Sequence, residues 1–150
     1  MDVGLTSWSQ RKRMVAPGKY AEMTPWKGLT LTPFVPLAEQ MQYKYLLYVE
    51  GHCAANRYST LMHMEAVIFK VESTCEAHQL WFFPMLTPFQ DHIPIKEDLS
   101  DLVEKVQWCR THDKECAKIA KQAKKCALQW FRQDYLCKAM ACILNNMHRL

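Results

Sequence analysis

The residues best suited to chemistry in this sequence surround a single arginine, Arg57. Gly51 follows an apolar run, and Ala54 and Ala55 keep the next stretch small before the polar pair Asn56 and Arg57. Small side chains let a ligand approach the backbone, and a guanidinium presents paired planar N–H donors that match phosphate oxygens. The pattern predicts a phosphate or diphosphate contact at Arg57, with a surface salt bridge as the alternative role.

Cys53 offers a second chemistry, because a thiolate is stabilised near the start of a helix and His52 precedes it. Adjacent residues on a turn usually point apart, so a nucleophilic cysteine is the weaker prediction.

The other cysteines do not suggest a metal centre. The chain has seven, an odd number without the spacing of a disulfide framework, which favours a reducing intracellular compartment. Cys109, His112 and Cys116 have a spacing that zinc tolerates, but a fourth ligand at a matching distance is missing. We therefore predict buried thiols here and no metal.

For Arg57 to contact a phosphate, a strand should precede it and a helix should begin near it. Residues 43–49 are β-prone and almost continuously apolar, residues 54–64 have helical spacing, and residues 66–71 return to strand character. This β-α-β order predicts a parallel pair joined by a right-handed crossover. Ligands of such sheets bind beyond the carboxyl ends of the strands, where Gly51 and Arg57 lie in the sequence.

The rest of the chain predicts one more strand and three helices. Residues 92–96 read as a short edge strand, since Pro94 cannot donate to a ladder. Asp98 and Asp101 suit the start of a helix with an apolar stripe of Leu99, Leu102, Val103 and Val106. A second helix is expected over 114–131, with three alanines and Trp130 inward, and a third from about Asp134.

Composition and charge narrow the class of protein. At 150 residues the chain suits one domain, expected over 43–150, preceded by an extended proline-containing arm over 1–42 with a short helix near Leu37. The net charge is +4, and the lysines between 114 and 125 lack interleaved aromatics, so we predict a solvated face and no nucleic acid. No apolar run approaches the ~20 residues of a membrane span, and the N-terminus lacks a secretory pattern.

Several segments resemble glycosyltransferase family 90, the capsule-associated and Rumi-type protein O-glucosyltransferases. The most specific is His92-Ile-Pro-Ile-Lys-Glu-Asp-Leu-Ser-Asp-Leu102, supported by residues 43–51, 54–58, 86–89 and 104–127. Pro33-Phe-Val-Pro36 and Lys70-Val-Glu-Ser73 are similar to homologues carried by large DNA viruses, which adds the virion as an expected location.

The resemblance implies an α/β fold in which two Rossmann-like halves of a GT-B enzyme close on a nucleotide sugar. This chain would be the C-terminal, donor-binding half, with a short parallel sheet flanked by helices and a helical C-terminus. Arg57 would contact the diphosphate of the donor substrate, near the backbone of Gly51, Ala54 and Ala55 and the turn from Asp98 to Ser100. The general base would belong to an N-terminal half supplied by a partner, and no cofactor is implied.

Two departures from the family pattern favour an alternative. Glu65 replaces a glycine and would oppose a diphosphate if it pointed into the cleft. Leu80 replaces a glutamate suited to ribose hydroxyls, for which Glu76 is a partial substitute, and Ser59 is a milder change. The alternative is a non-catalytic structural subunit, for example of a large viral particle, with residues 1–42 as a strap that docks on neighbouring subunits.

Overall fold

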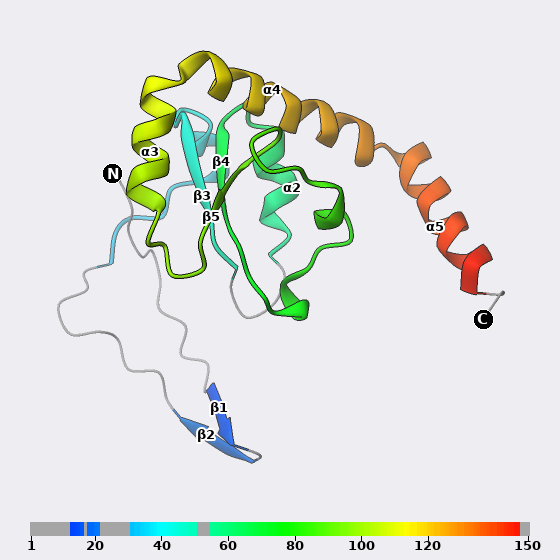
Figure 1. The fold of residues 1–150 in the computed structure, drawn as a ribbon. Coiled ribbons are helices and arrows are strands. Elements are labelled where there is room, and N and C mark those ends of the chain that lie inside the picture. The colour runs from blue at the N-terminus through cyan, green and yellow to red at the C-terminus, as the bar shows by residue number, and fades with distance from the viewer. Residues whose placement is uncertain (1–12, 17, 22–30, 51–54, 148–150) are drawn as a thin grey trace. The chain divides into compact units, whose positions relative to one another are not determined.

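The computed structural model describes residues 13–16, 18–21, 31–50 and 55–147 (Figure 1). The chain divides into two compact units, residues 1–40 and 41–150, and each is described by itself.

The first unit contains a hairpin that the sequence did not predict. Strands β1 (Arg13–Ala16) and β2 (Lys19–Ala21) pair antiparallel, and Gly18 in the turn has a φ of 72°, which a glycine adopts without strain. The expected short helix near Leu37 is confirmed as α1 (Leu37–Gln40), in which the N–H groups of Glu39 and Gln40 donate to the carbonyl oxygen of Pro36.

The second unit is built on a parallel three-stranded sheet. Strands β3 (Tyr45–Tyr48), β4 (Val67–Val71) and β5 (Ile93–Ile95) lie in the order β3-β4-β5, and helix α2 (Arg57–Met62) crosses from β3 to β4. The β-α-β unit, its parallel pairing and the edge position of β5 are thus confirmed. Helix α2 is shorter than the predicted 54–64.

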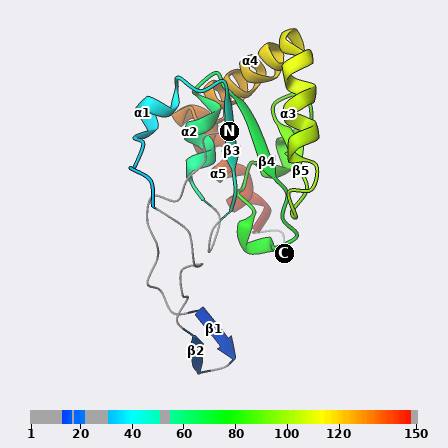
Figure 2. The ribbon, with the colours of Figure 1, turned by 90° about the vertical axis from the view of Figure 1, so that its left-hand side faces the viewer.

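Each face of the sheet has its own apolar core, and β4 contributes alternate residues to the two. Ile68 joins a cluster with α2, Phe82 and Phe83, while Val67 and Phe69 join a cluster with the C-terminal helices. Figure 2 shows α2 and α3 (Leu102–Thr111) on opposite sides of the strands. Two short 3₁₀ turns, η1 (Glu76–His78) and η2 (Phe83–Met85), lie between β4 and β5.

The long helix α4 (Asp113–Trp130) packs against both cores, as its small residues predicted. Its buried residues include Ala120, Ala123, Ala127 and Trp130, and four of its lysines are exposed. The stripe expected on α3 is only half right, because Leu102 and Val106 pack inward while Leu99 and Val103 face solvent.

Helix α5 (Gln133–Met147) runs away from the sheet (Figure 1). Its apolar Met140, Ile143 and Leu144 are all more than half exposed, so this predicted helix is present but its stripe is uncovered. Among the helices in the described ranges, none is long and apolar enough to cross a membrane.

Candidate functional site

The carboxyl edge of the sheet gathers most of the residues that the sequence singled out. All three strands end there because they are parallel. Glu50 follows β3, Lys70 is the last residue but one of β4, and Lys96 follows β5. Helix α2 runs back from this edge and therefore begins there, with Arg57 as its first residue.

Glu50 holds the end of β3 against the approach to α2. Its Oε1 lies 2.6 Å from the hydroxyl oxygen of Tyr48, and its Oε2 accepts a 2.9 Å hydrogen bond from the backbone N–H of Ala55. The same hydroxyl lies 2.9 Å from the carbonyl oxygen of Ala55. Burial, followed by the contact with Glu50, raises the pKa of Tyr48, which stays a neutral phenol. Glu50 and Tyr48 thus fix where α2 starts.

Arg57 is exposed and lies beside this buried tyrosine. Its guanidinium carbon is 5.8 Å from the centre of the Tyr48 ring. Within the described part of the chain Arg57 makes no salt bridge, so the alternative role of a surface ion pair finds no support there. Gly51 and Ala54, predicted to line the same site, fall outside the described residues, as do His52 and Cys53.

Lys70 is a functional candidate that the reasoning on chemistry missed. It pairs in register with Tyr48, so both side chains emerge on the same face of the sheet. Its ammonium nitrogen lies 4.6 Å from the centre of the Phe83 ring, a cation–π contact. Burial lowers the pKa of Lys70, and the nearby Glu72 and Glu50 partly oppose this shift. A lysine inside an otherwise apolar strand was the signal available in the sequence.

A hollow of about 390 Å³ opens between the ends of β4 and β5. Polar side chains of both signs line it: Lys70, Glu72, Ser73, Thr74, Gln79, Lys96 and Glu97. Ser73 Oγ lies 2.7 Å from His78 Nδ1, which ties this wall to η1. The hollow is therefore open, hydrophilic and adjacent to Lys70.

The predicted site residues Asp98 and Ser100 also lie at this edge, in a tight turn after β5. Asp98 Oδ1 accepts a 2.9 Å hydrogen bond from the N–H of Ser100, which lowers the pKa of that carboxyl group. Asp101 Oδ1 accepts from the N–H of Lys96 at 3.0 Å, and neither aspartate bonds the N–H groups of α3 as predicted for caps. Both carboxylates shape the turn, in which Leu99 has a φ of 60°.

Glu65 lies away from the carboxyl edge, so the condition under which it would oppose a diphosphate is not met. Glu65 lies between α2 and β4, at the amino edge of the sheet and the far end of α2 from Arg57. Its Oε1 accepts a 2.7 Å hydrogen bond from Lys124 Nζ, and its φ is 53°. The glycine usual in the family suits this left-handed backbone, so the departure concerns conformation and not the ligand.

Leu80 is half-buried and packs against the cluster that contains Phe82 and Phe83. It therefore supplies apolar contact where the family pattern has a glutamate. Glu76, the predicted substitute, is exposed on η1.

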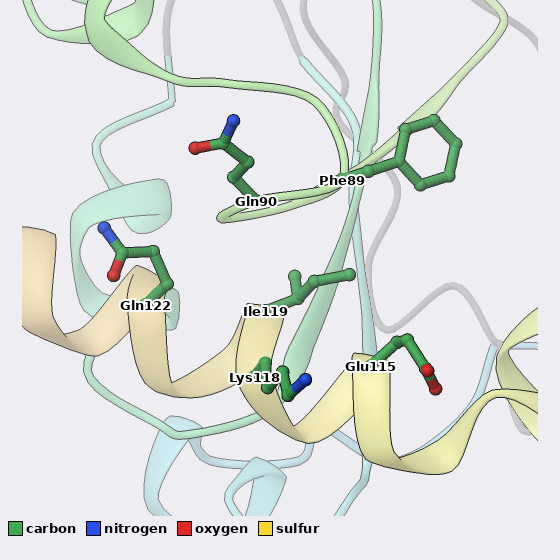
Figure 3. A pocket seen from close by; sticks show the side chains of 6 residues that line it. All are labelled: Phe89, Gln90, Glu115, Lys118, Ile119 and Gln122. Atoms are coloured by element: carbon green, nitrogen blue, oxygen red, sulfur yellow. The ribbon is translucent and has the colours of Figure 1, made fainter.

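A second hollow, of about 360 Å³, lies at the amino edge (Figure 3). Phe89 and Gln90 form one side, and Glu115, Lys118, Ile119 and Gln122 of α4 form the other. Lys118 is the one cationic side chain among the described residues that line this hollow, and none of the predicted site residues is among them. The hollow is therefore the weaker candidate for an anion-binding site.

The prediction that Cys109 and Cys116 are buried thiols is confirmed. Cys109 and Cys116 are fully buried, Cys116 Sγ donates to the carbonyl of Cys109 at 3.6 Å, and burial raises the pKa of Cys109 to about 12. Among the residues with described positions, no group of three or more histidine, cysteine or acidic side chains could hold a metal ion.

The fold and the site define the class of this protein: it is an α/β protein with cationic side chains at the carboxyl edge of a parallel sheet. A family model described as glycosyl transferase family 90 matches residues 8–150, and the chain belongs to that family. This agrees with the resemblance that residues 43–127 carry.

Relatives of two kinds match the chain. Uncharacterized protein 179R of Invertebrate iridescent virus 6 is 35% identical over 98% of this chain and 12% of its own length. Protein O-glucosyltransferase 2 of Danio rerio is 40% identical over 60% of the chain and 17% of its own length. Protein O-glucosyltransferase 1 of Rattus norvegicus is 26% identical over 84% of the chain and 33% of its own length. The chain thus spans at most a third of the length of these relatives.

Proposed function

We propose that this chain binds the nucleotide-sugar donor of a glycosyltransferase, as one Rossmann-like half of a GT-B arrangement. The observation that carries the proposal is Arg57 at the start of α2, on the carboxyl edge of a parallel sheet. Relatives of the chain are named protein O-glucosyltransferases, which supports a sugar bound to a nucleoside diphosphate as the ligand.

The chemistry follows from the charge of such a donor. The diphosphate leaves with the nucleotide when the sugar is transferred, so negative charge grows on its oxygens in the transition state. Arg57 would stabilise that charge through paired N–H donors, and the Glu50 and Tyr48 contacts would keep it in position. Activation of the acceptor hydroxyl is assigned to the other half of the fold, in the same or a partner polypeptide.

Thermal protection by a nucleoside diphosphate tests this proposal. Uridine and guanosine diphosphate sugars should each be tried, because the base is not assigned. At ligand a hundredfold above its Kd, the free energy of unfolding rises by about 2.7 kcal/mol, and Arg57→Ala should abolish the shift in melting temperature.

Arg110→Ala is the matched control, since Arg110 is an exposed arginine near the end of α3. It should keep the full shift. No protection of the wild-type chain at saturating nucleotide would refute the donor role.

A structural or interaction subunit is the second candidate, and Leu80 is the observation that favours it. A half-buried apolar side chain that packs against the core cannot accept a hydrogen bond from ribose. On this alternative the proline-containing residues 1–42 dock on a neighbouring subunit. Deletion of residues 1–40 should then abolish assembly and leave the melting temperature of the remaining chain measurable, whereas retained assembly would count against it.

A further inference from the structure

A second cation lies at the same edge of the sheet as Arg57, the proposed phosphate contact. Lys70 is the last residue but one of β4, at the edge where α2 begins with Arg57, and the register Tyr48↔Lys70 places it on the face of the sheet that α2 covers. In the described ranges no carboxylate lies within ion-pair distance of its ammonium group. Lys70 is thus a half-buried charge without a salt-bridge partner in those ranges.

An aromatic pair links the two cations. Arg57 lies against the Tyr48 ring and Lys70 against the Phe83 ring, and these rings meet edge to face with centroids 6.2 Å apart. The rings are buried, so both cations lie on one apolar support, and the half-buried Lys70 is partly shielded from water. A ligand with two adjacent anionic groups fits such a pair of cations better than a single phosphate does.

We propose that Lys70 is a second phosphate contact, which together with Arg57 selects a diphosphate over a monophosphate at this edge. The inference rests on the proposed donor role and adds a residue and a selectivity to it. Burial disfavours the charged form of Lys70 in the free protein and lowers its pKa. A bound anion would supply a counter-charge for the ammonium group. Glu50 and Glu72 face Lys70 at longer range, and Lys96 and Glu97 face it across the hollow.

Calorimetric titration with uridine or guanosine diphosphate, whichever binds the wild-type chain, tests the proposal. Lys70→Met replaces the apolar stem of the side chain with one of similar shape and removes the charge, and we expect the Kd for the diphosphate to rise roughly ten- to hundredfold. Lys70→Arg should bind within about fivefold of wild type, because a guanidinium also donates to phosphate. Lys121→Met, an exposed lysine of α4, should bind as wild type does.

The corresponding monophosphate separates a phosphate contact from a general loss of fold. Wild type should prefer the diphosphate, and Lys70→Met should lose most of that preference while the affinity for the monophosphate changes little. If Lys70→Met does not give a cooperative melt, Lys70→Gln replaces it in the same titrations.

The outcomes distinguish the two proposals. If Arg57→Ala abolishes diphosphate binding and Lys70→Met leaves both the Kd and the preference unchanged, the role of Lys70 is wrong and the donor role stands. If the wild-type chain binds neither diphosphate, both the donor role and the role of Lys70 are wrong.

Discussion

The charged side chains at the two edges of the parallel sheet have different partners. At the amino edge, Lys44 pairs with Asp113 and Lys124 with Glu65, so helix α4 neutralises charges that flank β3 and β4. At the carboxyl edge, Arg57 and Lys70 meet aromatic rings, and neither forms a salt bridge within the described residues.

This difference separates charges that serve the fold from charges that remain for a ligand. A lysine already paired with a carboxylate of the same chain has fewer N–H donors left for a phosphate, whereas a cation on an aromatic ring keeps its N–H donors available. Mutations at the amino edge should therefore change the stability of the fold, and mutations at the carboxyl edge should change the affinity for the ligand.

The largest effect on stability is expected at Asp91, a buried carboxylate just before β5. Its Oδ1 lies 2.6 Å from His92 Nδ1, and its Oδ2 accepts from the N–H of Thr87 at 2.8 Å. Asp91→Ala leaves these groups unpaired inside the protein, which should lower the free energy of unfolding by about 2–4 kcal/mol. Denaturant unfolding measures this loss.

Glu97→Ala is the matched control at the carboxyl edge, because Glu97 is an exposed carboxylate there. It should change the free energy of unfolding by less than about 0.5 kcal/mol. Equal losses in the two variants would contradict the division between the edges.

A smaller and opposite effect is expected from Glu65→Gly at the amino edge. The φ of 53° strains any side chain with a Cβ, so glycine should raise the melting temperature by roughly 3–6 °C despite the loss of the contact with Lys124. Glu65→Ala removes the same carboxylate without relieving the backbone, and should melt below wild type. A melting temperature of Glu65→Gly at or below that of Glu65→Ala would refute the conformational role.

Lys70→Met should also stabilise the free protein, by roughly 2–4 °C, because it replaces a desolvated charge with an apolar side chain at the end of β4. The same variant is expected to bind the diphosphate more weakly. A gain in stability with a loss of binding would mark Lys70 as a ligand-directed charge, and a fall in melting temperature would place it among the structural ones.

The parts of the fold that local patterns encode could be predicted from the sequence. Apolar runs at 43–49 and 66–71 with a helical stretch between them specified the β-α-β unit, and small residues specified the buried face of α4. The hairpin of β1 and β2 escaped prediction, because its strands contain charged residues, lack a long apolar run and lie in a stretch with prolines that was expected to be extended.

The candidate site was less predictable, because it depends on pairing between strands. Arg57 could be predicted from its position after a strand. The importance of Lys70 arises from its register with Tyr48 and its contact with Phe83, two residues that are distant from it in the sequence. The position of Glu65 could have been predicted, since a helix that crosses back from the carboxyl edge ends at the amino edge, where the next strand begins.

The smallest effect concerns the pH dependence of the exposed pair between Glu65 and Lys124. The hydrogen bond from Lys124 lowers the pKa of Glu65 below its ordinary value of 4.5. The pair therefore contributes its stability above pH 4.5 and loses it as the pH falls through the lower pKa of the folded state. Glu65→Gln, which keeps the backbone strain, should melt slightly below wild type at neutral pH, and the difference should vanish once the carboxylate is protonated. Melting curves of both proteins across this pH range measure the convergence. A difference that persists in acid would mean that Glu65 acts through packing, and the amino edge would then owe less to paired charge than its contacts indicate.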